Sequence, residues 1–552
     1  MPQLIRRNIL PCLLCTLLVG TSHLNAQVVW ETHTKEIYPY LSRMAQKGMI
    51  QFDDNIRPLS RKYIADCLDS LSNHYSQLSA TEKKELTFYR KEYGNELAPD
   101  TVDSREQVRF FRKDPYERWR SFSATGKKML LQIDPVFSAA TIRGSGKSVT
   151  QSSSGLHFWG YAGKHFGFQF FYDDITESGK GIDSTRRFTP ETGMIRKDTT
   201  LHSSQNFSRF RGSISYSWKN GSVSFGQDHL LWGYGQAGKI VLSDKAPAFP
   251  FIRLDYQPFS WLRFNYTHTW LNSAIIDSSR TYPTGNTIFG GQRNIFIPKF
   301  MATHSFQIRL NKGLYLAAGE SIVYSDQLDI GYLFPLMFFK VYDNIVNRSN
   351  IRAGSNGQLF FQLSSRNQLP KTHLYTTVFI DEIRISSIFN KTKSRNQLGF
   401  TLGASVTDVV LPYLTLGLEY TRVNPFVYRN LIPAQDYTSH DYFLGDWMGN
   451  NFDRLTYTLR YTPVARFKCQ LSYQTSRKGG SGTLAQQYFQ QPQPDFLFDL
   501  QHKQQELAAR FSYELIHNLQ LSAFYSSLTT DNRVTFQKST VQTYGVGFNY
   551  GW

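Results

Sequence analysis

The chain has 552 residues, of which 15% are aromatic, and its 61 Lys and Arg against 43 Asp and Glu give a formal net charge of +18. This length exceeds the roughly 100–200 residues of one ordinary soluble domain, although the mean hydropathy of -0.39 is that of a water-soluble protein. The basic residues are scattered and accompany no zinc-finger or RNA-binding motif, which argues against a nucleic-acid partner and favours an anionic glycan or lipid headgroup.

Residues 1–26 have the pattern of a secretory signal peptide. Arg6 and Arg7 precede a short apolar run from Ile9 to Gly20, and Ala26 is a plausible cleavage point. No later segment has 18 uninterrupted apolar residues, so no transmembrane helix is expected in the mature protein. A mature chain that sits in a membrane would then need a closed barrel, because open sheet edges cannot be hydrogen-bonded in lipid.

Residues 27–105 are predicted to form a small periplasmic helical region. Thr34 is a candidate N-cap for a first helix that ends at Gly48, and Ser60 for a second helix. Ser79 and Glu82 have the spacing of a capping box, which predicts a third helix. A plug or linker without a binding role is an alternative interpretation of this region.

Residues 106–552 are predicted to form an outer-membrane β-barrel, because apolar and polar residues alternate there with period two. Residues 261–270 are one example, in which Arg263, Asn265, Thr267 and Thr269 alternate with Leu262, Phe264, Tyr266 and His268. One face of such a strand meets lipid and the other a wet lumen. The pattern predicts roughly sixteen to twenty antiparallel strands.

The connections between these strands also indicate a barrel. Tight turns are predicted at 219–221, 257–260, 311–313 and 516–518, where Asn-Gly and Asn-x-Gly accept positive φ. Long polar loops are predicted at 173–208, 271–300, 321–356, 422–453 and 475–503. Short turns on one side and long loops on the other are typical of outer-membrane barrels.

The C-terminal strand has aromatic and apolar residues at strict i, i+2 spacing. These residues are Tyr544, Val546, Phe548, Tyr550 and Trp552. A final strand that ends on an aromatic residue is similar to the signal read by the outer-membrane barrel assembly machinery. We therefore expect this machinery and outer-membrane lipid to be partners of the chain.

Four segments, in order along the chain, resemble the Wzi capsule-assembly family in the form found in Bacteroidota. The first segment is 37–61, which contains Ile56-Arg57-Pro58-Leu59-Ser60, and the second is 226–247, which contains Trp232-Gly233-Tyr234-Gly235 and Leu242-Ser243-Asp244-Lys245-Ala246. The third is Tyr332-Leu333-Phe334-Pro335-Leu336-Met337-Phe338-Phe339, followed by the strand up to Asp381-Glu382. The fourth is 419–451, which contains Gly449-Asn450-Asn451. Tyr234 replaces the usual Pro of that family, and Asp244-Lys245 replaces the usual amides.

The resemblance implies an 18-stranded outer-membrane barrel with a periplasmic helical bundle. It also implies that the protein attaches or organises capsular or exopolysaccharide at the cell surface, as a lectin and not as an enzyme. Related Bacteroidota members are associated with gliding motility, so a surface component of motility or secretion machinery is an alternative. A porin-like solute channel is a further alternative from a different class.

Candidate polysaccharide-binding residues are Trp232, Tyr234, Asp244, Lys245, Trp447, Asn450 and Asn451. Aromatic rings can stack on sugars while amides bond their hydroxyl groups. Alternatively, Trp232 and Trp447 belong to an interfacial aromatic girdle. The scattered Arg and Lys favour an acidic polysaccharide, and a rim that faces lipopolysaccharide explains them equally well.

No catalytic, metal-binding or cofactor-binding pattern is recognised. Asp173-Asp174 and Asp381-Glu382 are adjacent acids, whose side chains point to opposite faces of a strand. Glycosidases hold two carboxylates at a defined separation in one cleft, so these acids are expected to pair with Arg or Lys at the lumenal wall or rim. We predict no enzyme activity, no metal and no cofactor.

Overall fold

The computed structural model describes residues 27–97, 107–126, 128–195, 203–285, 290–347, 354–383, 390 and 395–551. The predicted signal peptide and Trp552 lie outside the described residues. Among the described residues, no helix is long and apolar enough to cross a membrane.

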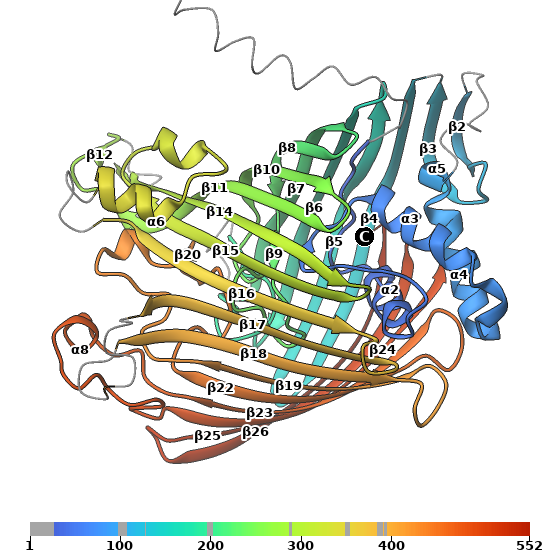
Figure 1. Ribbon diagram of the computed structural model, residues 1–552. Helices are drawn as coiled ribbons and strands as arrows, with labels where there is room; N and C mark the ends of the chain where they lie inside the picture. The colour runs from blue at the N-terminus through green and yellow to red at the C-terminus, as the bar shows by residue number, and fades with distance from the viewer. Residues whose placement is uncertain are drawn as a thin grey trace, which may run out of the picture.

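The chain forms a closed barrel of 18 antiparallel strands (Figure 1), which confirms the predicted fold class. Its strands are β4 (Met129–Gly144), β5 (Lys147–Ala162), β6 (Phe166–Lys180), β7 (Ser204–Trp218), β8 (Gly221–Asp228), β10 (Phe249–Phe259), β11 (Leu262–Ile276), β14 (Phe296–Asn311), β15 (Leu314–Ser325), β16 (Asn356–Arg366), β17 (Thr372–Ile383), β18 (Asn396–Thr407), β19 (Leu414–Val423), β22 (Phe452–Tyr461), β23 (Phe467–Lys478), β24 (His502–Ile516), β25 (Leu519–Asn532) and β26 (Gln537–Tyr550).

The barrel closes where its last strand pairs with β4. Tyr550 lies opposite Phe137 and Tyr544 opposite Arg143. The remaining part of the same edge, Met129 to Ile133, pairs with β3 (Trp119–Gly126), which forms a hairpin with β2 (Gln107–Lys113). Strand β4 therefore shares one edge between the terminal strand and this hairpin.

The terminal strand presents its predicted stripe to the outside of the barrel. The side chains of Tyr544, Val546 and Phe548 are exposed there, and Tyr550 lies on the same face. A role of this stripe in assembly stays a prediction.

The two ends of the barrel differ in the length of their connections. At one end, which we call the short-turn end, turns such as 219–220, 312–313 and 517–518 confirm the predicted hairpins, and the 257–260 turn falls slightly later, at 260–261. The other end, the long-loop end, carries 181–203, 277–295, 326–355, 424–451 and 479–501, each shorter than predicted because the strands continue further. Two connections there, 145–146 and 533–536, are tight, and a further long one at 229–248 was not predicted.

The N-terminal helices lie at the short-turn end (Figure 1). They are α2 (Ile37–Gln46), α3 (Arg61–Ser72), α4 (Ala80–Glu92) and α5 (Gly94–Leu97). The Ser60 cap of α3 and the Ser79–Glu82 capping box of α4 are both present, as predicted. The prediction for α2 was wrong, since its N-cap is Glu36 and not Thr34, and no side-chain cap is formed.

A buried charge cluster joins the helices to one another and to the barrel wall. The Arg61 guanidinium lies 2.9 Å from Glu31, 3.1 Å from Glu92 and 2.7 Å from Glu96, and packs over the Trp159 ring of β5 at 4.1 Å. Burial opposes the charge of Arg61, but the three carboxylates outweigh it and hold the pKa of Arg61 well above its usual value. The helical unit therefore depends on a largely buried ion cluster.

Removing the charge of Arg61 should make local opening of the N-terminal helices more frequent. In Arg61→Met, the buried carboxylates of Glu31 and Glu96 lose their cation, while Glu92 keeps Arg118 and Arg120, and breaking buried pairs in this way costs about 3–5 kcal/mol. We expect the amides of α3 and α4 to exchange hydrogen with solvent correspondingly faster than in the wild type. The matched control is Lys62→Met, which removes a half-exposed pair with Asp66 and should change the opening free energy by less than about 1 kcal/mol. Equal exchange in the two variants would contradict the prediction.

Candidate functional site

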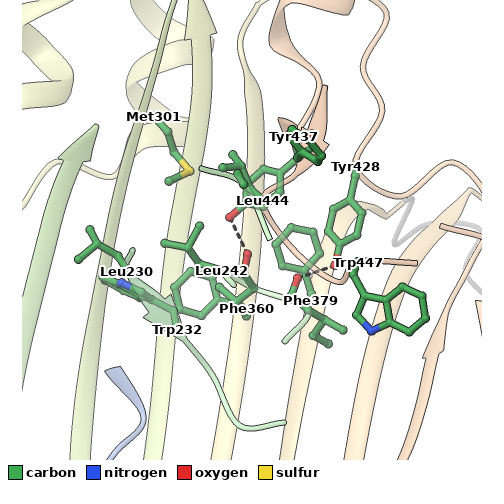
Figure 2. Packing of buried hydrophobic residues seen from close by; sticks show 14 of the residues in the cluster. Leu230, Trp232, Leu242, Met301, Phe360, Phe379, Tyr428, Tyr437, Leu444 and Trp447 are labelled. Carbon is green, nitrogen blue, oxygen red and sulfur yellow. Dashed lines mark hydrogen bonds between the residues drawn. The ribbon is translucent and has the colours of Figure 1, made fainter. Parts of the chain in front are cut away.

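Two long connections fold inward and fill the lumen near the long-loop end. Segment 229–248 and segment 424–451, which together we call the plug, contribute most of the largest buried apolar cluster (Figure 2). Wall residues of β10, β14–β17, β19 and β22 and Ile56 from the N-terminal region complete it. The members that Figure 2 labels are Leu230, Trp232, Leu242, Met301, Phe360, Phe379, Tyr428, Tyr437, Leu444 and Trp447.

The plug meets the N-terminal region inside the lumen. A short strand β9 (Leu231–Trp232) pairs with β1 (Ile56–Arg57), with Ile56 opposite Trp232. The chain then turns at Gly233, whose φ of +100° strongly favours glycine. The glycine after Trp232 thus allows a backbone turn. The turn follows the point where segments from both ends of the barrel come into contact.

Two lumenal side chains of the wall fix the path of the plug. The Glu419 carboxylate of β19 accepts hydrogen bonds from the backbone N–H groups of Gln236 and Ala237, at 2.6 and 3.0 Å. The Arg454 guanidinium of β22 binds the Asp446 carboxylate at 2.6 and 3.0 Å, and both side chains are almost completely buried. These contacts tie each half of the plug to the barrel.

Four predicted sugar-binding residues are part of this packing. Trp232 is 1% exposed and Trp447 9%, and the Trp447 indole N–H donates to the Ala237 carbonyl at 3.1 Å. Asn450 and Asn451 are buried, and their side-chain amides donate to backbone carbonyls of Val427 and Gly480. The expected exposed stacking surface is therefore absent at these four residues. The girdle alternative does not hold for the two tryptophans either, because they lie in the lumen.

Asp244 and Lys245 connect the plug to other segments. Asp244 lies 3.0 Å from the His33 ring. Burial opposes the ionisation of Asp244, but the hydrogen bond and charge of His33 outweigh burial and lower the pKa of Asp244 to about 2. The Lys245 amine donates to the carbonyls of Thr189 and Glu191 at 2.9 and 2.7 Å, and burial lowers the pKa of Lys245 to about 8. Both residues have structural partners.

Tyr234, the remaining predicted residue, lines a lumenal cavity of about 550 Å³. The cavity lies between α2 on the short-turn side and the plug, against the wall formed by β17–β19 and β22–β25. Tyr40, Tyr234, Tyr375 and Tyr413 contribute aromatic rings to its lining. This volume falls in the range of about 300–1,000 Å³ that is usual for small-molecule sites.

The lining of this cavity is strongly basic. It contains Arg43, Arg57, Lys239, Arg460, Lys468 and Arg510, and Glu36 is its one carboxylate among the described residues. Arg43, Arg57 and Lys468 already pair with acids. Within the described part of the chain, no carboxylate forms an ion pair with Lys239, Arg460 or Arg510. Burial raises the pKa of Glu36, which further favours a positive cavity.

None of these three cations was predicted as a site residue, although the sequence carries a signal for two of them. Arg460 stands between Leu459 and Tyr461, and Arg510 stands between Ala509 and Phe511. A charge flanked by apolar residues in a period-two strand must face the lumen. Lys239 had no such signal, because its position depends on the inward fold of a loop.

The paired acids have structural roles. Asp173 binds Arg209 at 2.6 and 3.0 Å, which is the expected pairing across neighbouring strands. The side chain of Asp381 accepts the backbone N–H of Tyr428 at 2.7 Å and thereby holds the plug. Among the described residues, no three His, Cys, Asp or Glu side chains are grouped as a metal site.

The buried Asp446–Arg454 pair should control whether the plug stays closed. Arg454→Met leaves the Asp446 carboxylate uncompensated, which costs about 3–5 kcal/mol in a buried setting. We expect this variant to show larger and more frequent ion currents than the wild type in planar lipid bilayers. Arg477→Met is the control, because it removes a half-exposed pair with Asp453 and should leave the currents unchanged. Wild-type currents in Arg454→Met would mean that the pair does not hold the plug.

No protein-family model and no curated protein matches the sequence. Among solved structures, Wzi of Escherichia coli, described as an outer-membrane protein involved in group 1 capsule assembly and as a carbohydrate-binding β-barrel, has 12% identity and a TM-score of 0.58, covering 96% of this chain and 100% of that chain. OprD of Pseudomonas aeruginosa has 9% identity and a TM-score of 0.43 over 82% and 98%. OccK3 of the same organism has 12% identity and a TM-score of 0.41 over 76% and 95%. The chain thus has an outer-membrane β-barrel fold, similar over its length to that of Wzi.

Proposed function

We propose that this protein is a non-catalytic barrel of the outer membrane that binds an acidic surface polysaccharide and so attaches or organises it at the cell. The observation that carries the proposal is the basic lumenal cavity. It is lined by three cations, Lys239, Arg460 and Arg510, that form no ion pair with a carboxylate of the described residues, and four buried tyrosines shape its wall.

The chemistry of this lining suits acidic sugars. A guanidinium binds a carboxylate or sulfate with two parallel hydrogen bonds. The four tyrosines are buried, so they shape the wall of the cavity and do not offer open ring faces for stacking. Neutral hydrogen-bonding side chains such as Gln470 and Ser522 complete the wall, and Ser522 is exposed in the lumen.

The proposed location in the outer membrane is supported by the surface of the barrel. Outward-facing side chains such as Leu418, Leu471 and Phe511 are exposed, while their strand neighbours face the lumen. Exposed apolar residues on a closed sheet fit contact with lipid acyl chains. The proposed signal peptide and the proposed assembly stripe on β26 fit export by the same route.

A solute channel is less well supported than polysaccharide binding. The plug and the N-terminal segment occupy the lumen beside β10–β17. A motility or secretion role predicts a spreading defect in a deletion strain whose surface polymer stays attached. The polysaccharide role predicts instead that a deletion strain releases its surface polymer into the medium. Normal cell-bound polymer in the deletion strain would contradict this role.

Removing the lumenal cations should weaken the binding of acidic oligosaccharide. Hydrogen bonds to charged groups contribute about 1.5–3 kcal/mol each, so Arg460→Gln and Arg510→Gln should each lower the affinity for trigalacturonate by about 10- to 100-fold. Calorimetry on the purified protein measures this, with maltotriose as the neutral probe. Arg533→Gln is the matched control, because Arg533 lies in an exposed turn and pairs with Asp531. Equal affinity in all three variants would exclude the cavity as the site.

The affinity should also fall as the pH rises from 7 to 9. Burial lowers the pKa of Lys239 to about 8, so this amine is largely charged at pH 7 and largely neutral at pH 9. An acidic ligand therefore loses one cationic partner over this range, while the arginines keep their charge. Lys239→Met should bind more weakly at pH 7 and show no change up to pH 9. A fall of the same size in that variant would assign the effect to another group.

A further inference from the structure

The connection that follows β15 folds back against the outer wall of the barrel. Its described part, residues 326–347, contains a 3-10 turn (Ile330–Leu333), α6 (Phe339–Tyr342) and a π-type turn (Asp343–Asn347). Tyr332 and Phe339 are fully buried against outward-facing residues of β11, β14 and β15, among them Tyr266, Ile322 and Tyr324. Because of this cover, Phe264 and Tyr266 are buried, although the period-two pattern places them on the outer face.

The wall beneath this segment carries polar groups at positions that otherwise face lipid. The Glu320 carboxylate accepts the backbone N–H groups of Phe339 and Lys340, at 3.0 and 2.5 Å. The Tyr266 hydroxyl donates to the Tyr332 carbonyl at 2.8 Å, and a ring nitrogen of His304 lies 3.0 Å from the Pro335 carbonyl. The outer wall thus supplies hydrogen-bond partners to the backbone of the segment.

The segment also satisfies part of its backbone internally. The N–H groups of Tyr332, Phe334, Met337 and Tyr342 donate to carbonyls within the segment, at 2.9 to 3.3 Å. Irregular backbone is tolerated at membrane depth only where its polar groups have partners in the protein. The segment has such partners both from the wall and from its own turns.

The side of the segment that points away from the barrel is mostly apolar, and its half-exposed Lys340 pairs with Asp343 at 3.5 Å. Its exposed side chains include Ile330, Phe334, Leu336, Phe338, Val341 and Ile345, each between 54% and 78% exposed. This surface continues into the exposed outer face of the neighbouring strands, where Leu316, Leu359 and Phe361 lie. Glu320 pairs with Leu359 in the middle of this wall, so the covered polar groups lie within the apolar band and not at its rim.

We propose that residues 326–347 form a re-entrant segment in the leaflet on the long-loop side, with lipid acyl chains against its apolar surface. Uncovered, Glu320 and His304 would face hydrocarbon, which is unfavourable for polar and charged groups. The segment covers them and presents apolar side chains in their place. This inference rests on the proposed membrane location, and not on saccharide binding.

Fluorescence quenching tests which medium covers the segment. In a Cys469→Ser background, a fluorophore is attached at Phe338→Cys, and the protein is reconstituted in phosphatidylcholine vesicles with brominated acyl chains. We expect Phe338→Cys to lose fluorescence as strongly as Leu316→Cys on the outer wall, and to resist aqueous iodide. Val534→Cys in an exposed turn should show the opposite response.

The possible outcomes distinguish the re-entrant segment from the membrane location on which it rests. Quenching at Leu316→Cys but not at Phe338→Cys overturns the re-entrant segment and keeps the membrane location. Absence of quenching at both overturns both. Protection of Phe338→Cys from lipid and iodide alike, with cross-linking to a second copy, would assign the surface to a protein interface instead.

Proteolysis tests the anchoring by Glu320. Glu320→Leu removes the acceptor of two backbone N–H groups, so in the detergent-solubilised protein, where the lipid is removed, trypsin should cleave after Lys340 about 10- to 100-fold faster, the factor that follows from lost hydrogen bonds to a charged acceptor. Glu506→Leu, which removes a lumenal carboxylate bonded to Ser526, should leave cleavage at Lys340 unchanged. An unchanged rate in Glu320→Leu would overturn the anchoring role.

Discussion

Hydrogen bonding of the backbone is the constraint on which this structure depends, since water cannot supply it in the proposed membrane. Every strand needs a partner on both edges, and the sheet meets that need only by closing between β26 and β4. The rest of the β4 edge is paired with β3. The same constraint explains why the segment after β15 is fastened by side chains of the outer wall, since it leaves the ladder at a depth where water cannot replace lost partners.

The lumen differs from the outer face, because its walls are polar and segments from both ends of the barrel fill it. The N-terminal region enters with β1 and the plug with β9, and the two pair inside the barrel. On the side of β18–β25, neither filler reaches the wall completely. The cavity is what remains there, and its cations have fewer acidic neighbours than those of the helical unit, where three carboxylates surround Arg61.

The strands could be predicted from the sequence because period two is a local property of the chain. Tight turns followed from Asn and Gly for the same reason, and the caps at Ser60 and Ser79 from local side-chain chemistry. The position of Trp232 could not be predicted in this way. A tryptophan in a loop has the same local sequence whether it packs in the lumen, stacks on a sugar or lies at the membrane interface. Its burial is decided by residues far along the chain, such as Phe360.

A similar limit applied to the outer wall. The alternation along β11 correctly placed Phe264 and Tyr266 on the outer face, but the pattern carries no information about what covers that face. The cover comes from residues about 70 positions later, including Tyr332. The sequence therefore predicted which way each strand faces, and missed the contacts made by loops that fold back on the barrel.

The pairing of β1 with β9 has a mechanical meaning. A pull on the plug from the long-loop side is opposed by the ladder between Ile56 and Trp232 and by the contact of Asp244 with His33. Through these links the load passes to the helices at the opposite end, where the ions around Arg61 share it with the wall at Trp159. Tension applied on one side of the barrel is thus transmitted to a unit on the other side.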